Sequence, residues 1–164
     1  MDVFHSALII STFLCSLVAG FLFSYAIVVM PGIKSLSDRN FIRTFQVTDR
    51  IIQNNNPIFM LVWLGSAVAI IVTVIYGIRS LQGTDFALLA VATLAYIFGV
   101  QVSTIVIHLP LNNKLQSINI DTMNDLDLKE ARNNFESSWN TSNLTRTWIA
   151  CFVTALLIIL VFRQ

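Results

Sequence analysis

Three polar side chains share one face of an otherwise apolar stretch in the second half of the chain. Gln101, Thr104 and His108 are spaced i, i+3 and i+7, which places them on the same side of a helix. A glutamine and a histidine at membrane depth are costly unless they face protein or a wet cavity. This face is therefore expected either to make hydrogen bonds between helices or to form the wall of a pocket.

The residues that follow, "LPLNNKL", indicate the mouth of such a pocket. Pro110 cannot donate a hydrogen bond to the carbonyl of Val106, so the helix is expected to loosen there. Asn112 and Asn113 then offer amide groups at the loosened end.

A second polar stripe directly precedes the last apolar stretch. Its members are spaced by 4, 3, 4 and 3 residues and are Arg132, Glu136, Trp139, Asn143 and Arg146. This stripe fits a solvated face with its tryptophan at the lipid headgroups. It also fits a pocket lining in which arginine holds an anion and tryptophan supplies an aromatic wall.

A third stripe has the same spacing and consists of Arg39, Arg43, Gln46, Arg50 and Gln53. Phe41, Phe45 and Ile52 lie on another side of the same segment. The pattern predicts an amphipathic helix on the membrane surface, where its basic residues meet anionic headgroups.

The composition is that of a membrane protein. Of 164 residues, 55% are apolar and only 12% are charged, whereas about 25% are charged in a soluble domain. Four stretches are long enough to span a bilayer, namely 6–30, 58–78, 86–107 and 144–162. We predict one integral membrane domain over 1–164, an all-α bundle of four transmembrane helices with two long, partly helical loops on the same membrane side.

The ends and faces of these helices carry further signals. Pro31-Gly32 is expected to stop the first helix, and Asn56-Pro57 to start the second. Small residues recur every fourth position at Ser16, Gly20 and Ser24 in the first span, and at Gly65, Ala69, Thr73 and Gly77 in the second. Such stripes predict close contact between helices.

Several kinds of site are not indicated. Cys15 and Cys151 both fall in apolar spans, without a CxxC motif, which argues against a disulfide framework or a thiolate metal site. The only histidine besides His108 is His5, which we expect at the opposite membrane face, so no metal site is predicted. The net charge of +1 gives no signal for nucleic-acid binding.

Basic residues predict the orientation. Most lie in the long loops 31–57 and 109–143, and only Arg79 and Arg163 lie on the other side. The positive-inside rule places both loops in the cytoplasm and both termini outside. We expect the membrane to be the bacterial plasma (inner) membrane.

The order of the motifs resembles the anthrone oxygenase-like family of small four-helix membrane proteins. The resemblance covers nearly the whole chain and rests on "MPGI", "FQ" at 45–46, "NP" at 56–57, "PLNN" at 110–113, and then Trp139, Asn143 and Arg146. It implies oxidation of polyketide anthrones with molecular oxygen and without a recognised cofactor. The implied positions are Gln46, Asn56, Asn112, Asn143 and Arg146, with Trp139 beside them. The family more usually has asparagine at position 108, so the resemblance assigns no role to His108.

Oxidation of an anthrone needs a base, or donors that stabilise an enolate oxygen, beside a flat apolar slot. Arg146, with Asn112 or Asn143, could bind the oxyanion, and Trp139 could stack on the ring. His108 is the first candidate for the base, because an unperturbed imidazole titrates near neutrality. Glu136 is the second. We predict no cofactor, and molecular oxygen as the co-substrate.

Two other functions stay open. The same polar face could belong to a non-catalytic membrane module that binds a lipid, a quinone or a partner protein. A transporter is less favoured, because the sequence has no inverted repeat and no broken helix at the midplane. The expected partners are the lipid bilayer and a small lipophilic ligand, and a homo-oligomer stays open.

Overall fold

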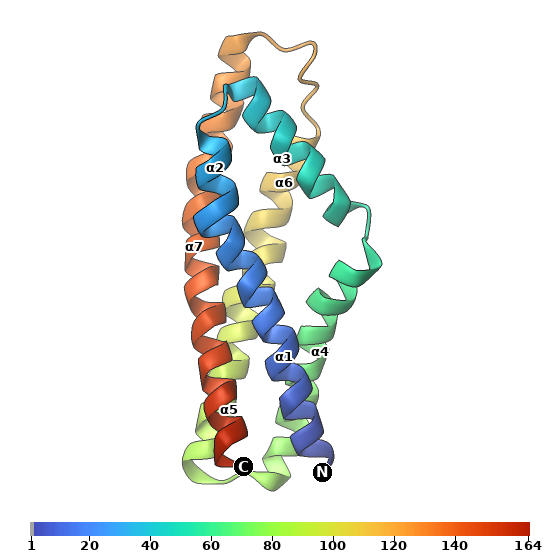
Figure 1. Ribbon diagram of the computed structural model, residues 1–164, viewed down its shortest axis with the longest axis vertical. Coiled ribbons are helices and arrows are strands. Elements are labelled where there is room, and N and C mark those ends of the chain that lie inside the picture. The colour runs from blue at the N-terminus through green and yellow to red at the C-terminus, as the bar shows by residue number, and fades with distance from the viewer. Residues whose placement is uncertain (1) are drawn as a thin grey trace.

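The computed structural model describes residues 2–164, and four long helical rods make up most of it (Figure 1). The first rod consists of α1 (Val3–Ser24), a π-helical segment (Tyr25–Val29) and α2 (Met30–Lys34). The second is α4 (Pro57–Ser80). The third consists of α5 (Gly83–Leu94), π-helical segments at Ala95–Val102 and Thr104–His108, and α6 (Leu109–Gln116). The fourth is α7 (Asp125–Arg163). Residues 2–164 contain no strand, so the predicted all-α four-helix bundle is confirmed.

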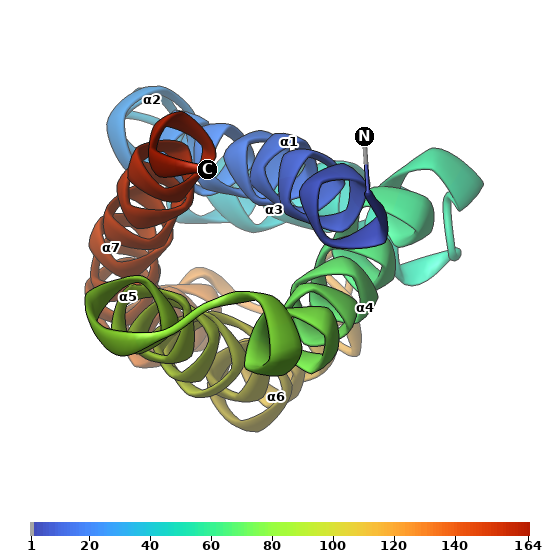
Figure 2. The same ribbon diagram turned by 90° about the horizontal axis from the view of Figure 1, so that it is seen from below.

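The rods stand around a square, so that α1, α4, α5 and α7 each pack against two neighbours (Figure 2). A shorter helix, α3 (Asp38–Gln53), slants across one end of the bundle from α2 to α4 (Figure 1). The connection between α6 and α7 lies at that same end, whereas both termini lie at the other.

All four rods are long and apolar enough to cross a membrane, at 32, 24, 34 and 39 residues, where about 20 suffice. Their outer faces carry large apolar side chains, among them Phe13, Leu61, Phe98 and Trp148. The rods are therefore compatible with an integral membrane protein.

Two prolines do not interrupt the rods as predicted. The expected stop at Pro31-Gly32 is wrong, because the helix continues to Lys34. The helix also continues past Pro110 to Gln116. Each proline comes just after a π-helical segment. A π turn leaves a carbonyl without its usual intrahelical donor, so a proline that follows it loses little hydrogen bonding. Much of the predicted loop 109–143 is therefore helix.

The predicted contact stripes behave differently on the two helices. On α4, Thr73 and Gly77 are buried, and a Cβ at Gly77 would meet Leu89 and Phe4. On α1, Gly20 is exposed and has nothing within 4 Å of where its Cβ would be. At Gly20 the α1 stripe therefore makes no close helix contact within the described chain, and the prediction of close packing is wrong at that position.

The apolar face of α3 packs on protein instead of lying on the membrane surface. Phe41 and Phe45 are buried, and the Phe45 ring lies 4.6 Å from that of Phe135 and 5.5 Å from that of Trp139, both on α7. Two apolar cores result. One core lies between α1, α4, α5 and α7, and the other joins α3 to α6 and α7.

Candidate functional site

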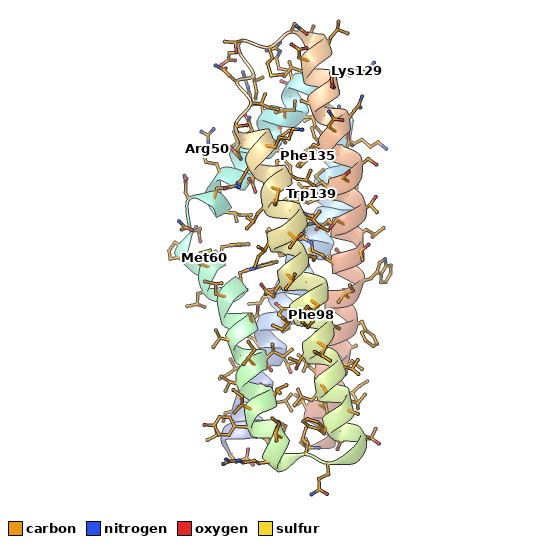
Figure 3. All side chains as sticks on the ribbon, turned by 180° about the vertical axis from the view of Figure 1, so that it is seen from behind. Arg50, Met60, Phe98, Lys129, Phe135 and Trp139 are labelled. Atoms are coloured by element: carbon orange, nitrogen blue, oxygen red, sulfur yellow. The ribbon has the colours of Figure 1, made fainter. Side chains whose placement is uncertain are left out.

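A cavity of about 350 Å³ lies where the two cores meet. Side chains from α1, α3, α4, the α5–α6 rod and α7 line it. Six of its lining side chains carry large aromatic rings: Phe21, Tyr25, Phe45, Phe59, Trp63 and Trp139. Met60 and Trp139 both lie in the upper half of the bundle, above the level of Phe98 (Figure 3). The size and the apolar lining are those of a pocket for a small organic ligand.

A buried arginine supplies positive charge to this cavity. Arg146 is only 4% exposed. Its Nη1 donates to Thr104 Oγ1 at 2.7 Å, and its Nη2 lies 3.1 Å from His108 Nδ1 and 3.0 Å from Asn143 Oδ1. Its buried Nε has no hydrogen-bond partner, and no carboxylate within residues 2–164 pairs with the guanidinium. A buried cation without a counter-ion is costly, so this cavity favours an anionic oxygen.

His108 lines the cavity, but both of its ring nitrogens are engaged. A guanidinium has only donors, so Nδ1 must accept the hydrogen bond from Arg146. Nε2 lies 2.9 Å from Ser142 Oγ and, in the neutral ring, carries the proton that it donates there. The imidazole also stands edge-on to Trp139, with 5.1 Å between the ring centroids. This arrangement leaves His108 no free lone pair toward the cavity.

Asn112 joins two other members of the predicted site. Its Oδ1 accepts a hydrogen bond from Trp139 Nε1 at 2.9 Å, and its Nδ2 donates to Asp49 Oδ1 at 2.8 Å. On the α1 side, Asn143 Nδ2 donates to the carbonyl of Leu22 at 3.2 Å. These contacts fix the amide groups of Asn112 and Asn143 at the cavity wall.

Asp49 is a lining residue that the sequence interpretation missed. It is 3% exposed, and besides Asn112 it accepts hydrogen bonds from Gln53 Nε2 at 3.0 Å and Gln116 Nε2 at 3.1 Å. No cation pairs with it among the residues that the structure describes. One signal could have found it: it follows Phe45 by four residues and so falls on the apolar face of α3, where an acid is unexpected.

Four of the predicted site residues do not line the cavity. Glu136 binds Arg132 Nε at 2.7 Å. Gln46 donates to the carbonyls of Leu115 and Ile118 at 2.8 and 3.0 Å, and so ties α3 to α6. Asn113 accepts from Gln53 at 3.1 Å. Asn56 caps α4 as predicted, because its Oδ1 accepts from two backbone N–H groups at 3.1 Å.

A second hollow of about 530 Å³ adjoins the cavity, between α1, α3 and α4. The two share five lining residues: Phe21, Tyr25, Ile52, Phe59 and Trp63. Leu17, Ile58 and Val62 complete much of the outer hollow. An apolar groove therefore runs from the side of the bundle to the cavity wall.

The fold and the site together define a four-helix protein of membrane-spanning length with an aromatic cavity that contains buried charge. The model of the family described as anthrone oxygenase matches residues 52–156, which is more than half of the chain. The chain belongs to the anthrone oxygenase family. No curated protein and no solved structure matches it. The matched range includes His108, Asn112 and Arg146 but begins three residues after Asp49.

Proposed function

We propose that this protein is a cofactor-independent oxygenase that oxidises a lipophilic aromatic molecule of anthrone-like or hydroquinone-like structure. The observation that carries the proposal is the buried guanidinium of Arg146, which faces an aromatic cavity without a carboxylate partner among residues 2–164. Family membership supports the reaction class. The apolar groove between α1, α3 and α4 supports a substrate that arrives from the bilayer.

The chemistry asks little of the protein beyond a base and an oxyanion site. Loss of a proton from the methylene group of an anthrone gives an enolate, and the enolate carbon gives its electrons to molecular oxygen in a new C–O bond. The resulting peroxide anion takes up a proton and then loses water as the second methylene hydrogen leaves. One oxygen atom ends in the new carbonyl group and the other in water, so the substrate is oxidised by four electrons, which reduce both atoms of molecular oxygen. No cofactor is proposed, because the enolate itself reduces oxygen.

Arg146 would stabilise the enolate oxygen. Its fork is held by Thr104, His108 and Asn143, so the donors are in place before the charge develops. Preorganised donors of this kind commonly contribute 10² to 10³-fold to turnover. Trp139, itself held by Asn112, would form one wall of the aromatic slot.

Oxygen uptake by the detergent-purified protein tests this proposal. The protein would be offered anthrones and hydroquinones, with and without a chelator. We expect substrate-dependent uptake that survives chelation, and a loss of about 10²-fold or more in Arg146→Lys, which keeps the charge but loses the fork. Arg50→Lys, on the exposed face of α3, is the matched control and should keep wild-type turnover.

The non-catalytic alternative is favoured by one observation, namely that both ring nitrogens of His108 are engaged. A binding module would show no oxygen uptake with any compound of the panel, while one of the compounds raised the melting temperature of the wild-type protein. That result would reject the oxygenase.

A further inference from the structure

The cavity is lined by two opposite charges that do not pair with each other. Arg146 and Asp49 are both buried and both line it. No salt bridge joins them to each other or to any other residue in the part of the chain that the structure describes. Buried charges of this kind are expensive when unpaired, and a protein built only for stability would bring them together. Because both charges line one cavity without pairing, a ligand in that cavity could contact both.

The carboxylate of Asp49 is held in place by neutral groups only. Oδ1 accepts one hydrogen bond, from Asn112, and Oδ2 accepts two, from Gln53 and Gln116. A carboxylate offers about four acceptor positions, so one position remains on the oxygen that Asn112 contacts. Three amides thus orient Asp49 and still leave it able to accept a proton.

The other candidate bases lack this freedom. His108 Nδ1 accepts from Arg146, and its Nε2 faces Ser142. Glu136 is held by Arg132 and does not line the cavity. Asp49 is the single acid among the cavity-lining residues within 2–164.

We propose that Asp49 is the catalytic base, which takes a proton from a neutral, enolisable aromatic ketone whose carbonyl oxygen lies against Arg146. This inference rests on the proposed function and names its substrate class. The C–H bond breaks, its electron pair stays on the substrate as an enolate, and the proton moves to Asp49. Asp49 then returns that proton to the peroxide anion. It takes up the second methylene proton as the O–O bond breaks and passes it to the departing hydroxide, which leaves as water and frees the carboxylate again.

The charges of the cavity favour this step. Before the transfer the negative charge is on Asp49, which forms no salt bridge within residues 2–164, and after it the charge is on an oxygen beside the unpaired guanidinium. The transfer therefore creates an ion pair at Arg146 while the total charge of the cavity stays the same. Stabilisation that appears only as the charge develops is the kind that raises turnover.

Deuterium exchange without oxygen isolates this step. The full-length protein in detergent would be incubated anaerobically with anthrone in D₂O, and exchange of the methylene hydrogens followed by NMR. We expect the wild type to accelerate exchange, and Asp49→Asn to lose this acceleration by 10² to 10⁴-fold. Asp49→Asn should still bind anthrone, as seen by quenching of tryptophan fluorescence. Asp121→Asn, a change at an exposed carboxylate paired with Arg43, is the matched control.

The outcomes separate the two proposals. Wild-type exchange that Asp49→Asn loses, without aerobic oxygen uptake by the wild type, would reject the oxygenase and keep Asp49 as a base. Oxygen uptake by the wild type, with exchange in Asp49→Asn within threefold of wild type, would overturn the role of Asp49. If Asp49→Asn does not fold, Asp49→Glu decides: partial exchange supports the base, and full exchange by Asp49→Ala contradicts it.

Discussion

Two arginines on the inner face of α7 have opposite surroundings. Arg132 binds Glu136 at 2.7 Å and Asp38 at 3.0 Å, and also donates to the carbonyls of Lys34 and Leu36. Arg146, about 21 Å further along the helix axis, contacts a hydroxyl, an imidazole and an amide instead. The comparison shows that the first arginine fastens the α2–α3 corner to α7, whereas the charge of the second is left for a ligand.

The largest expected effect is on the turnover of Arg146→Met. This change removes the cation from the cavity and should lower turnover by more than 10²-fold. Stability should change little, because the loss of a buried unpaired charge offsets the loss of its three hydrogen bonds. Oxygen uptake and the melting temperature in detergent, measured on the same sample, check both parts.

Arg132→Met should show the reverse pattern. It leaves Glu136 and Asp38 without their cation, and the three side chains are 11%, 17% and 35% exposed. After allowance for solvent screening, we expect a loss of about 1–3 kcal/mol in the free energy of unfolding. Thermal unfolding monitored by tryptophan fluorescence measures it. The comparison would fail if Arg146→Met lowered the melting temperature more than Arg132→Met did.

Trp139→Phe is expected to have the smallest effect. It keeps the aromatic wall but removes the Nε1–H that orients Asn112, so Asn112 and with it Asp49 become less fixed. One neutral hydrogen bond is worth about 1 kcal/mol. If that energy is lost from the stabilisation of the transition state, turnover should fall about fivefold to tenfold. Steady-state oxygen uptake tests this, and Trp148→Phe on the exposed face of α7 serves as the control. An unchanged rate would mean that Asn112 is held by other contacts.

The four rods, and the face of α7 that runs from Arg132 to Arg146, could be predicted from the sequence. Helical spacing tells which side chains share a face, and it placed Trp139, Asn143 and Arg146 together correctly. It could not tell the two arginines apart, because the partner Asp38 is 94 residues away from Arg132 in the chain. Asp49 was missed for the same reason, since all but one of its amide donors lie on α6.

The sequence pattern also could not predict that the helices continue past Pro31 and Pro110. A proline at 31 or 110 reads as an end of a helix, and only the π-helical hydrogen bonds before each one explain why the helix goes on. These bonds join Met30 to Tyr25 and Leu109 to Thr104. The orientation in the membrane stays a prediction from the basic residues.

The π-helical segments set the phase of the third rod. Each π turn holds more residues than an α turn, so the angular position of every later side chain depends on it. Removing one residue between Thr104 and His108 would turn α6 by about 100° relative to α5. Asn112 would then leave the cavity wall, although no residue of the cavity itself had been exchanged. The direction of the Asn112 side chain thus depends on the number of residues in the third rod as well as on their identity.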